Sequence, residues 1–258
     1  MEASRSLAGR VARRVRRALW PPPPPPPPAV VPPQERWTYD GDGLKTIHNC
    51  DFLKDPLFRE AYRLGRETGS WHGFDIEWRA YVVCWAAQKG RGLEGDYVEC
   101  GVNRGGYSRA AMHYVDFASL PGKKFYLIDS YSGIPEEFME EENRAFLEDI
   151  YTECYDDVVR TFAPFENAVV VRGVVPYVLP EVGAERVCYL SIDMNNAASE
   201  IAAAEFFWDK VVSGAVIVLD DYGFSPFIRQ KHAFDAFARE RGVAVLSLPT
   251  GQGLIFKP

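Results

Sequence analysis

Short apolar runs alternate with helical patterns over the part of the chain that follows Gly95. The runs are continuously apolar rather than alternating, which is typical of parallel strands buried on both faces. Strands that alternate with helices predict a doubly wound α/β fold, here with a mostly parallel seven-stranded sheet covered by helices on both faces. We expect strands at Tyr97–Cys100, Phe125–Ile128, Ala168–Val171, Val187–Ile192, Ala215–Leu219, Val243–Leu248 and Leu254–Phe256, and helices at Ser108–Phe117, Glu141–Thr161, Ser199–Val212 and Pro226–Arg241.

The last two strands and the segment before the sheet carry further signals. Only residues 249–253 separate the last two expected strands, which is too short for a crossover helix and predicts an antiparallel last strand at the sheet edge. Residues 37–94 have a helical pattern, with Asp55 and Asp75 as expected N-caps. Ser225 has the same expected role for the last helix. We therefore expect a helical N-terminal part in front of the sheet.

The first 36 residues differ in composition from the rest. Residues 6–20 place apolar side chains at four-residue steps among arginines, which predicts a short basic amphipathic helix. Such a helix could contact a membrane surface or a partner weakly, or it could be a solvated tail, and its shortness favours the tail. Pro21–Pro28 predicts a polyproline II spacer of roughly 25 Å at ~3.1 Å per residue, which serves as a stiff linker or as a ligand for a proline-binding module. We expect residues 1–36 to be disordered beside one domain of residues 37–258, whose core is residues 95–258.

The charge of the chain is unevenly distributed. Residues 1–20 hold six arginines and one glutamate, so the overall net charge of −7 combines +5 on this segment with −12 on the remainder. An acidic body is unsuited to nucleic acid, because the neutralisation of phosphates needs a basic surface. It suits a cationic substrate or a metal ion better.

The cysteines and the lengths of the apolar runs bear on the location of the protein. The chain has five cysteines without a Cys-x-x-Cys pair, which argues for a reducing compartment and against a disulfide framework or a zinc site. No apolar run reaches the roughly 18 residues of a membrane span, and the basic start lacks the apolar region of a signal peptide. We expect a cytoplasmic protein.

A glycine loop follows the first expected strand of the sheet. Gly101, Gly105 and Gly106 lie between this strand and a helix, where they would let a ligand approach the backbone at the helix N-terminus. Their spacing is not the G-x-G-x-x-G of dinucleotide enzymes. Asp129 ends the next strand, the place at which an acid binds ribose hydroxyls in doubly wound folds. Together these features favour nucleoside binding over a loop-capping role for Asp129.

Three acids stand at the ends of two further strands. Asp193 follows the fourth expected strand, and Asp220 and Asp221 follow the fifth. An adjacent pair of acids alone could be turn chemistry, but consecutive strands are commonly neighbours, which would bring the three carboxylates to one rim. Their mutual repulsion would require a cation. Magnesium fits, because it prefers oxygen ligands and neither stretch contains histidine or cysteine.

Four stretches together resemble a known family. They are GDYVECGVNRGGYSRA, FYLIDSYSGIPE, YLSIDMNNAASEIAAAEFFWDKVVSGAVIVLDDYGF and LSLPTGQGLIFKP, and over about residues 40–258 they are similar to the macrocin O-methyltransferases in order and spacing. The resemblance implies a Rossmann-like methyltransferase fold of class I and a dependence on S-adenosylmethionine. It also implies methylation of sugar hydroxyls of natural products with a bound Mg²⁺ ion.

The resemblance implies roles for individual residues. Asp193, Asp220 and Asp221 would hold Mg²⁺, which would bind two neighbouring acceptor hydroxyls and lower the pKa of one of them. Asp193 would also act as the general base. Residues 136–160 resemble the family's mobile lid over the substrate. The cofactor would be held at its methionine end by Glu99, Gly101, Gly105, Gly106 and Ser108, at its ribose by Asp129, and at its adenine by Arg172 and Gly173.

The chain departs from the family pattern after Asp193. The family has a second acid two residues later and then a Tyr-Glu-Ser stretch, whereas this chain has Asn195 and Ala197 at the places of the acid and the tyrosine. Asparagine can still offer an oxygen, but the site loses a charge and an aromatic wall. The acceptor could therefore differ from a macrolide sugar.

These features predict an O-methyltransferase that acts on a hydroxylated small molecule, in the first place a sugar, with no nucleic acid as a partner. We also expect a homo-oligomer. One alternative is methylation of a lipid-linked or cell-surface saccharide, with the basic arm on an anionic membrane. A second is a non-catalytic scaffold that binds the cofactor and recruits a partner through its polyproline segment. The glycine loop, Asp129 and the three rim acids favour the enzyme over the scaffold.

Overall fold

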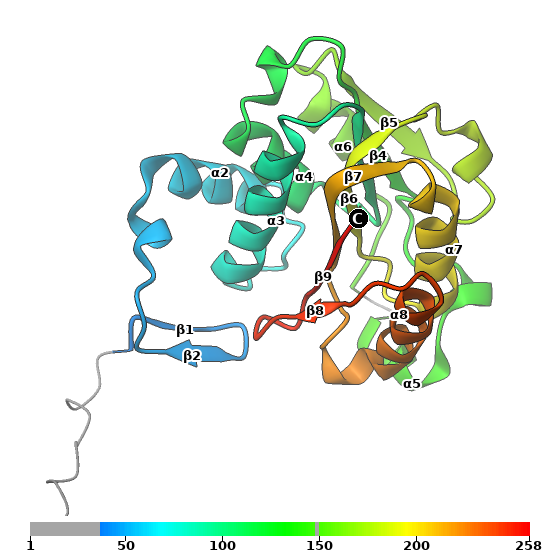
Figure 1. The fold of residues 1–258 in the computed structure, drawn as a ribbon. Coiled ribbons are helices and arrows are strands. Elements are labelled where there is room, and N and C mark those ends of the chain that lie inside the picture. Colours follow the sequence, from blue (N-terminus) through cyan, green and yellow to red (C-terminus); the bar gives the residue numbers. More distant parts are fainter. Residues whose placement is uncertain (1–36, 148–149) are drawn as a thin grey trace, which may run out of the picture. The chain divides into compact units, whose positions relative to one another are not determined.

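A seven-stranded sheet in the order β5-β4-β3-β6-β7-β9-β8 forms the centre of the fold (Figure 1). Strands β3 to β7 run parallel, and β9 pairs antiparallel with both β7 and β8. This confirms the predicted mostly parallel sheet with an antiparallel last strand. The strands are β3 (Asp96–Cys100), β4 (Phe125–Asp129), β5 (Ala168–Arg172), β6 (Val187–Ile192), β7 (Val211–Leu219), β8 (Leu246–Ser247) and β9 (Gly253–Phe256).

The computed structural model describes residues 37–147 and 150–258. Residues 37–258 form one compact unit. The expected basic helix and polyproline spacer lie outside the described residues. Within the described part of the chain, no helix combines the length and the apolar character needed to cross a membrane.

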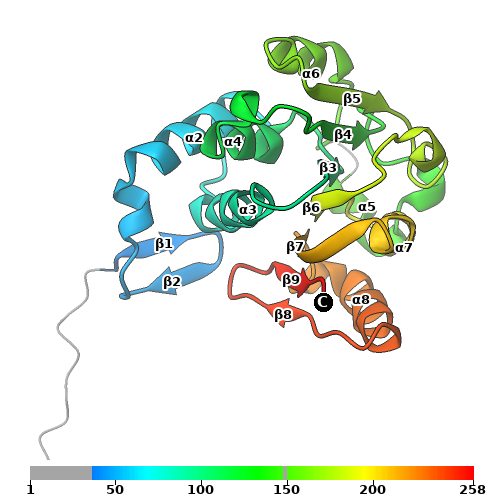
Figure 2. The same cartoon turned by 45° about the horizontal axis from the view of Figure 1, so that its top comes forward.

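Helices cover both faces of the sheet (Figure 2). Alternate strand residues point to opposite faces, so Tyr97 and Tyr189 pack with α2, α3, α4 and α6, while Val98 and Leu190 pack with α7 and α8. All four strand residues are fully buried, which accounts for the continuously apolar runs. The helices are α2 (Pro56–Glu67), α3 (Glu77–Gly90), α4 (Gly106–Tyr114), α5 (Glu141–Leu147), α6 (Tyr155–Phe162), α7 (Ala197–Trp208) and α8 (Ile228–Glu240).

The chain reverses its direction of winding between β3 and β6. From β3 it proceeds through β4 to β5 on one side, and it then returns to add β6 and β7 on the other side. Such a switch point leaves a crevice beyond the carboxyl ends of the two central strands, where doubly wound folds bind ligands. The sheet order therefore predicts where the functional site lies.

A hairpin that the helical interpretation missed precedes α2. Strands β1 (Tyr39–Gly41) and β2 (Leu44–Thr46) pair antiparallel across Asp42 and Gly43. These two residues have φ values of 50° and 71°, the left-handed conformation that an Asp-Gly turn between paired strands adopts. An Asp-Gly pair is a hairpin signal, but three-residue strands are too short to show alternation.

The predicted helix starts are correct in one case and wrong in two. Asp55 caps α2, since its Oδ1 accepts the Leu57 amide at 2.9 Å. Asp75 does not cap α3, which begins at Glu77; its carboxylate pairs with Arg66 instead. Ser225 does not cap α8, because a 3₁₀ turn precedes that helix.

Several predicted element boundaries are also wrong. The expected helix Glu141–Thr161 is interrupted between α5 and α6, because residues 150–154 turn towards the crevice at the strand ends. The expected helix Ser199–Val212 ends at Trp208, since Val211 already pairs with Val187 in the sheet. The expected strand Val243–Leu248 shortens to the two residues of β8.

Candidate active site

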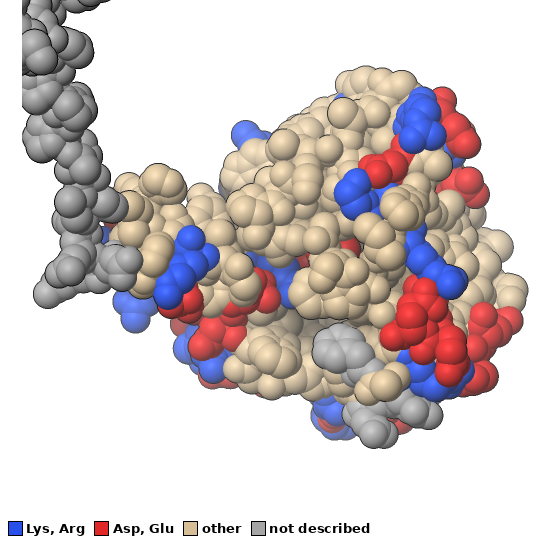
Figure 3. Space-filling view, turned by 90° about the horizontal axis from the view of Figure 1, so that it is seen from below, with Lys and Arg blue, Asp and Glu red and all other residues tan. Residues whose placement is uncertain are grey.

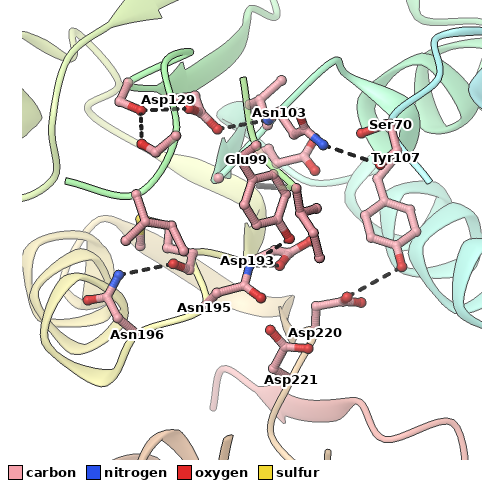
Figure 4. A pocket seen from close by; sticks show the side chains of 18 of the residues that line it. Ser70, Glu99, Asn103, Tyr107, Asp129, Asp193, Asn195, Asn196, Asp220 and Asp221 are labelled. Carbon is pink, nitrogen blue, oxygen red and sulfur yellow. Dashed lines mark hydrogen bonds between the residues drawn. The ribbon is translucent and has the colours of Figure 1, made fainter. Parts of the chain in front are cut away.

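A pocket of about 290 Å³ lies at the carboxyl ends of β3, β4, β6 and β7. Gly101, Asp129, Asp193 and Asp220 each follow or end one of these strands, and all four line the pocket. Figure 4 shows Asp129 on one side of the pocket and the acids that follow β6 and β7 on another. The pocket thus joins the two sets of residues that the sequence singled out.

Gly101 is required where β3 and β6 approach each other. Its φ of 89° is left-handed, and a Cβ at this position would lie 1.7 Å from the carbonyl oxygen of Asp193. A side chain here would force the two strand ends apart. The glycine therefore brings the first loop of the sheet within reach of the acids after β6.

The other two glycines of the loop meet protein side chains rather than the pocket. A Cβ on Gly105 would lie 2.4 Å from the ring of Phe162, and a Cβ on Gly106 would lie 2.6 Å from Nε1 of Trp71. Neither glycine lines the pocket formed by the described residues. In this structure they permit close packing of α4 against its neighbours.

Asp129 is tied to the glycine loop by its carboxylate. Oδ2 accepts the Asn103 amide at 2.7 Å, and Oδ1 accepts the Tyr131 amide at 2.6 Å. Burial raises the pKa of Asp129, while these backbone donors oppose the rise. The carboxylate is thus positioned by two loops and also lines the pocket, so the loop-capping and ligand-binding interpretations are compatible.

Glu99 is a buried acid on β3 that also lines the pocket. Its side chain is 1% exposed, and the hydroxyl of Ser108 donates a hydrogen bond to Oε2. Burial raises the pKa of Glu99 to about 8. A carboxyl held in this way would gain from a positively charged group of a ligand, which would favour its ionised form.

The three rim acids lie on neighbouring strands, as predicted. Ile192 and Leu219 are paired in the parallel ladder of β6 and β7, so the acids that follow them are adjacent. Burial and the charge of Asp220 raise the pKa of Asp193 well above its usual range and that of Asp221 to about 7. The site therefore concentrates negative charge that its own donors compensate only in part.

Within this group the acids have unequal partners. Asp220 is 4% exposed and accepts hydrogen bonds from Arg79 at 2.7 Å and from Gln252 at 2.9 Å. The buried Oδ2 of Asp221 has no hydrogen-bond partner among the described residues. Within residues 37–147 and 150–258, the side chain of Asp193 has only a long contact of 3.4 Å from Asn195. An unpartnered buried carboxylate oxygen fits a site that receives a cation or a hydroxyl group.

No ready-made metal cage accompanies these acids. Among residues 37–147 and 150–258, no group of three or more His, Cys, Asp or Glu side chains is arranged to hold a metal ion. Oxygen donors for a hard cation are nevertheless present in Asp193 and Asp221. Any cation here would need further oxygen ligands from water or from an acceptor.

Comparisons with known proteins agree with this geometry. The family model of the macrocin O-methyltransferases (TylF) matches residues 81–246, which is well over half of the chain. The chain belongs to this family. It is therefore an O-methyltransferase that depends on S-adenosylmethionine. No match to a curated protein sequence was found.

Solved structures of other methyltransferases share the fold. The O-methyltransferase NovP has a TM-score of 0.58 at 20% identity, over 69% of this chain and 79% of its own. CalS11, a TDP-rhamnose 3′-O-methyltransferase of calicheamicin biosynthesis, has a TM-score of 0.52 at 13% identity, over 82% of this chain and 87% of its own. An O-methyltransferase from Bacillus cereus in complex with SAH has a TM-score of 0.53 at 12% identity, over 80% of this chain and 96% of its own.

Only some of the site residues that the resemblance to the macrocin O-methyltransferases implies line the pocket. Of the expected cofactor residues, Glu99, Gly101, Asp129 and Gly173 line it, together with all three expected metal ligands. Gly105, Gly106, Ser108 and Arg172 do not line the part formed by the described residues. Ser108 acts on the pocket through Glu99, whereas Arg172 forms an ion pair with Glu153 at 2.7 Å.

Tyr151 contributes an aromatic side chain to the pocket of this methyltransferase, which has Ala197 at the position of the family's tyrosine. Its hydroxyl accepts a hydrogen bond from Nδ2 of Asn195 at 3.2 Å, and both residues line the pocket. The backbone amide of Ala197 donates to Glu140 at 3.1 Å. The segment before α6 thus places the ring of Tyr151 beside Asn195. A comparison of the sequence with the family pattern at position 197 could not show this.

Several pocket residues escaped the sequence analysis because they come from the N-terminal part. Arg79 of α3, Asp42 of the hairpin and His72 before α3 all line the pocket. Arg79 directly precedes the apolar run of residues 80–87 within α3, which was an available signal. His72 carries a left-handed φ of 50°, which the sequence does not reveal.

Proposed function

We propose that this methyltransferase transfers a methyl group to one hydroxyl of a sugar, or of another small molecule with two neighbouring hydroxyls, with the assistance of Mg²⁺. The observation that carries the proposal is the acidic end of the pocket. Three carboxylates meet there beside the residues at the ends of β3 and β4 that we expect to bind the cofactor, and one buried oxygen of Asp221 lacks a hydrogen-bond partner in the described ranges. This arrangement suits a cation that also binds acceptor oxygens.

The residues that fit S-adenosylmethionine lie at the ends of β3, β4 and β5. Asp129 would accept the ribose hydroxyls, and Glu99 would face the positively charged methionine end. Gly101 and Gly173 line the pocket without side chains, which would let the cofactor lie against the backbone. The bound cofactor would supply a methyl group on a sulfonium, and S-adenosylhomocysteine would leave as a neutral thioether when the acceptor oxygen displaces it.

Asp193 and Asp221 are the residues we assign to the acceptor end. A cation at their oxygens would lower the pKa of a coordinated hydroxyl. Asp193 would accept the proton of that hydroxyl at a carboxylate oxygen. The pocket walls would keep the acceptor oxygen in line with the methyl group, since position supplies much of the rate in such transfers.

The lining of the pocket supports an uncharged acceptor with an apolar part. Phe74 and Phe224 line it and are 68% and 38% exposed, so they are available to cover an apolar body. Among the described residues, Arg79 is the only Lys or Arg in the lining, and it is engaged by two aspartates. A diphosphate such as that of the CalS11 substrate would find no uncommitted Lys or Arg in this lining.

Three further properties remain proposals. We propose that residues 136–160 act as a lid, which is supported by Tyr151 and its neighbours in the pocket wall. We propose a cytoplasmic location, which is supported by five cysteines that are all buried and unpaired. The expected homo-oligomer stays a prediction.

On the face drawn in Figure 3, Lys and Arg side chains are interspersed with Asp and Glu.

The decisive experiment is a transfer assay with labelled S-adenosylmethionine. A panel of neutral glycosides, nucleotide sugars and simple diols would be tested with Mg²⁺ and with a chelator. We expect labelled product from a neutral glycoside that disappears with the chelator and returns with Mg²⁺. Product formation that is indifferent to the chelator would contradict the metal-assisted mechanism. Cofactor binding without product from any hydroxyl compound would favour the scaffold.

A further inference from the structure

Arg79 connects the N-terminal hairpin to the acidic end of the pocket. Its Nε and Nη2 donate to the two oxygens of Asp42 at 2.7 and 3.3 Å, and its Nη1 donates to Oδ2 of Asp220 at 2.7 Å. The side chains of Arg79 and Asp42 are each 17% exposed, and that of Asp220 is 4% exposed. The planar guanidinium therefore bridges two aspartates that are far apart in the chain, in a setting largely removed from water.

Both carboxylate oxygens of Asp220 accept hydrogen bonds from the protein. Oδ2 is held by Arg79 and receives a longer contact of 3.4 Å from the Tyr107 hydroxyl, while Oδ1 accepts from Gln252 at 2.9 Å. In the part of the chain that the structure describes, Asp221 and Asp193 have no comparable donors. The three acids, although adjacent, are therefore not equivalent: one is already paired with an arginine of the protein and two are available to a ligand.

We propose that Arg79 is a positioning residue that holds Asp220 as an internal ion pair and leaves Asp193 and Asp221 as the carboxylates that bind the cation. The inference rests on the proposed Mg²⁺-assisted function. Two carboxylates occupy fewer coordination positions than three, so more positions remain for acceptor hydroxyls. The hairpin residue Asp42 fixes the other side of the guanidinium and so becomes part of the site.

The inference predicts an unusual direction of change. When Arg79 is replaced by glutamine, Asp220 is released and the site becomes one charge more negative, so the protein should bind a divalent cation more tightly. A residue with a merely structural role would weaken cation binding or leave it unchanged when it is removed. Activity should fall at the same time, because the released carboxylate competes with the acceptor for the cation.

The test is calorimetric titration of the full chain with Mn²⁺, without cofactor or acceptor. We expect Arg79→Gln to bind Mn²⁺ about tenfold more tightly than the wild type, which corresponds to about 1.4 kcal/mol. Arg66→Gln is the matched control, since Arg66 forms an ion pair with Asp75 at 2.7 Å and its side chain is 49% exposed. The control should bind Mn²⁺ as the wild type does.

A double variant tests whether Asp220 is the source of the gain. Arg79→Gln combined with Asp220→Asn removes one charge of each sign, so Mn²⁺ affinity should return to within about threefold of the wild type. If Arg79→Gln does not fold, as judged by its thermal unfolding, Arg79→Lys replaces it. Lysine cannot bridge both aspartates, so the same direction with a smaller gain is expected.

The outcomes separate the two proposals. Weaker or unchanged Mn²⁺ binding by folded Arg79→Gln, with binding by the wild type, overturns the role of Arg79 and leaves the proposed function standing. A gain that persists in the double variant also overturns it. If neither the wild type nor the variants bind Mn²⁺, both this inference and the metal-assisted part of the proposed function are wrong.

Discussion

Asp220 and Asp221 are adjacent in the chain but have opposite surroundings in the pocket. Asp220 accepts hydrogen bonds from Arg79 and Gln252, whereas Oδ2 of Asp221 is buried without a partner in the described part of the chain. Both acids lie in the turn that follows β7 and line the pocket, but only Asp220 is paired with Arg79 of α3. We therefore expect Asp221, rather than Asp220, to be available to a bound cation, and the first prediction concerns its replacement.

Replacement of Asp221 by asparagine should abolish most activity while cofactor affinity stays near that of the wild type. The lost carboxylate would remove a ligand of the cation, so we expect kcat to fall by at least about 100-fold. Steady-state kinetics and calorimetry with S-adenosylhomocysteine measure the two effects. Asp235→Asn, which alters an ion pair with Lys231 on α8, is the control. Equal losses of activity and cofactor affinity would mean that Asp221 is structural.

Replacement of Asp129 by asparagine should weaken cofactor binding. The carboxylate would lose its charge-assisted hydrogen bonds to the ribose, each worth about 1.5–3 kcal/mol, so we expect a rise of the dissociation constant by at least about tenfold. At saturating cofactor, kcat should change much less. The measurement is calorimetry with S-adenosylhomocysteine together with kinetics at two cofactor concentrations. An unchanged dissociation constant would reject the ribose contact and leave the capping of Asn103 and Tyr131 as the role of Asp129.

Replacement of Gly101 by alanine should destabilise the fold more than the same change at Gly122. Both glycines have left-handed φ values, 89° and 80°, but a Cβ on Gly101 would meet the Asp193 carbonyl whereas one on Gly122 would meet nothing within 4 Å. Backbone strain of about 1–3 kcal/mol is common to both, and overpacking adds about 1–3 kcal/mol at Gly101 alone. Urea denaturation measures the difference in the free energy of unfolding. Equal losses at the two sites would contradict the close approach of β3 and β6.

The buried carboxyl of Glu99 should make stability depend on pH. Its pKa is raised from 4.5 to about 8, so the folded protein holds a proton that the unfolded chain releases between these two values. The free energy of unfolding should therefore be largest below pH 4.5 with respect to this group and should fall as pH rises towards 8. Between pH 5.5 and 7.5, Glu99→Gln should lose less stability than the wild type, by at least about 1 kcal/mol in urea denaturation. Parallel pH profiles for the two proteins would show that Glu99 does not titrate in this range.

The fold was largely predictable because its strands are buried on both faces. Val187–Ile192 was predicted with its observed bounds, since a run of six buried residues leaves little choice of register or end. Boundaries failed where tertiary contacts override local preference. Residues 150–154 interrupt a sequence with helical character because they turn towards the pocket, and Val211 belongs to β7 because the neighbouring strand supplies its partner.

The candidate site was predictable where residues are tied to strand ends. The acids after β4, β6 and β7 could be brought together from the sequence alone, because the carboxyl ends of neighbouring parallel strands share one rim. The different hydrogen-bond partners of those acids could not be predicted from the sequence. They depend on Arg79, Asp42 and Gln252, which reach the rim from a helix, a hairpin and the last strand pair, through contacts that span 141, 37 and 32 residues of sequence.

The sequence by itself determined the class of fold, the family and the strand ends that carry the chemistry, because hydrophobic burial and strand-end position are local properties of the chain. The tertiary structure decided which of these residues are already satisfied by the protein and which remain open to a ligand. Hydrogen-bond partners and desolvation depend on the three-dimensional neighbours of a side chain, and these neighbours come from distant segments. Gly105 is an example, since a side chain at this position would meet the ring of Phe162, which is distant in the sequence.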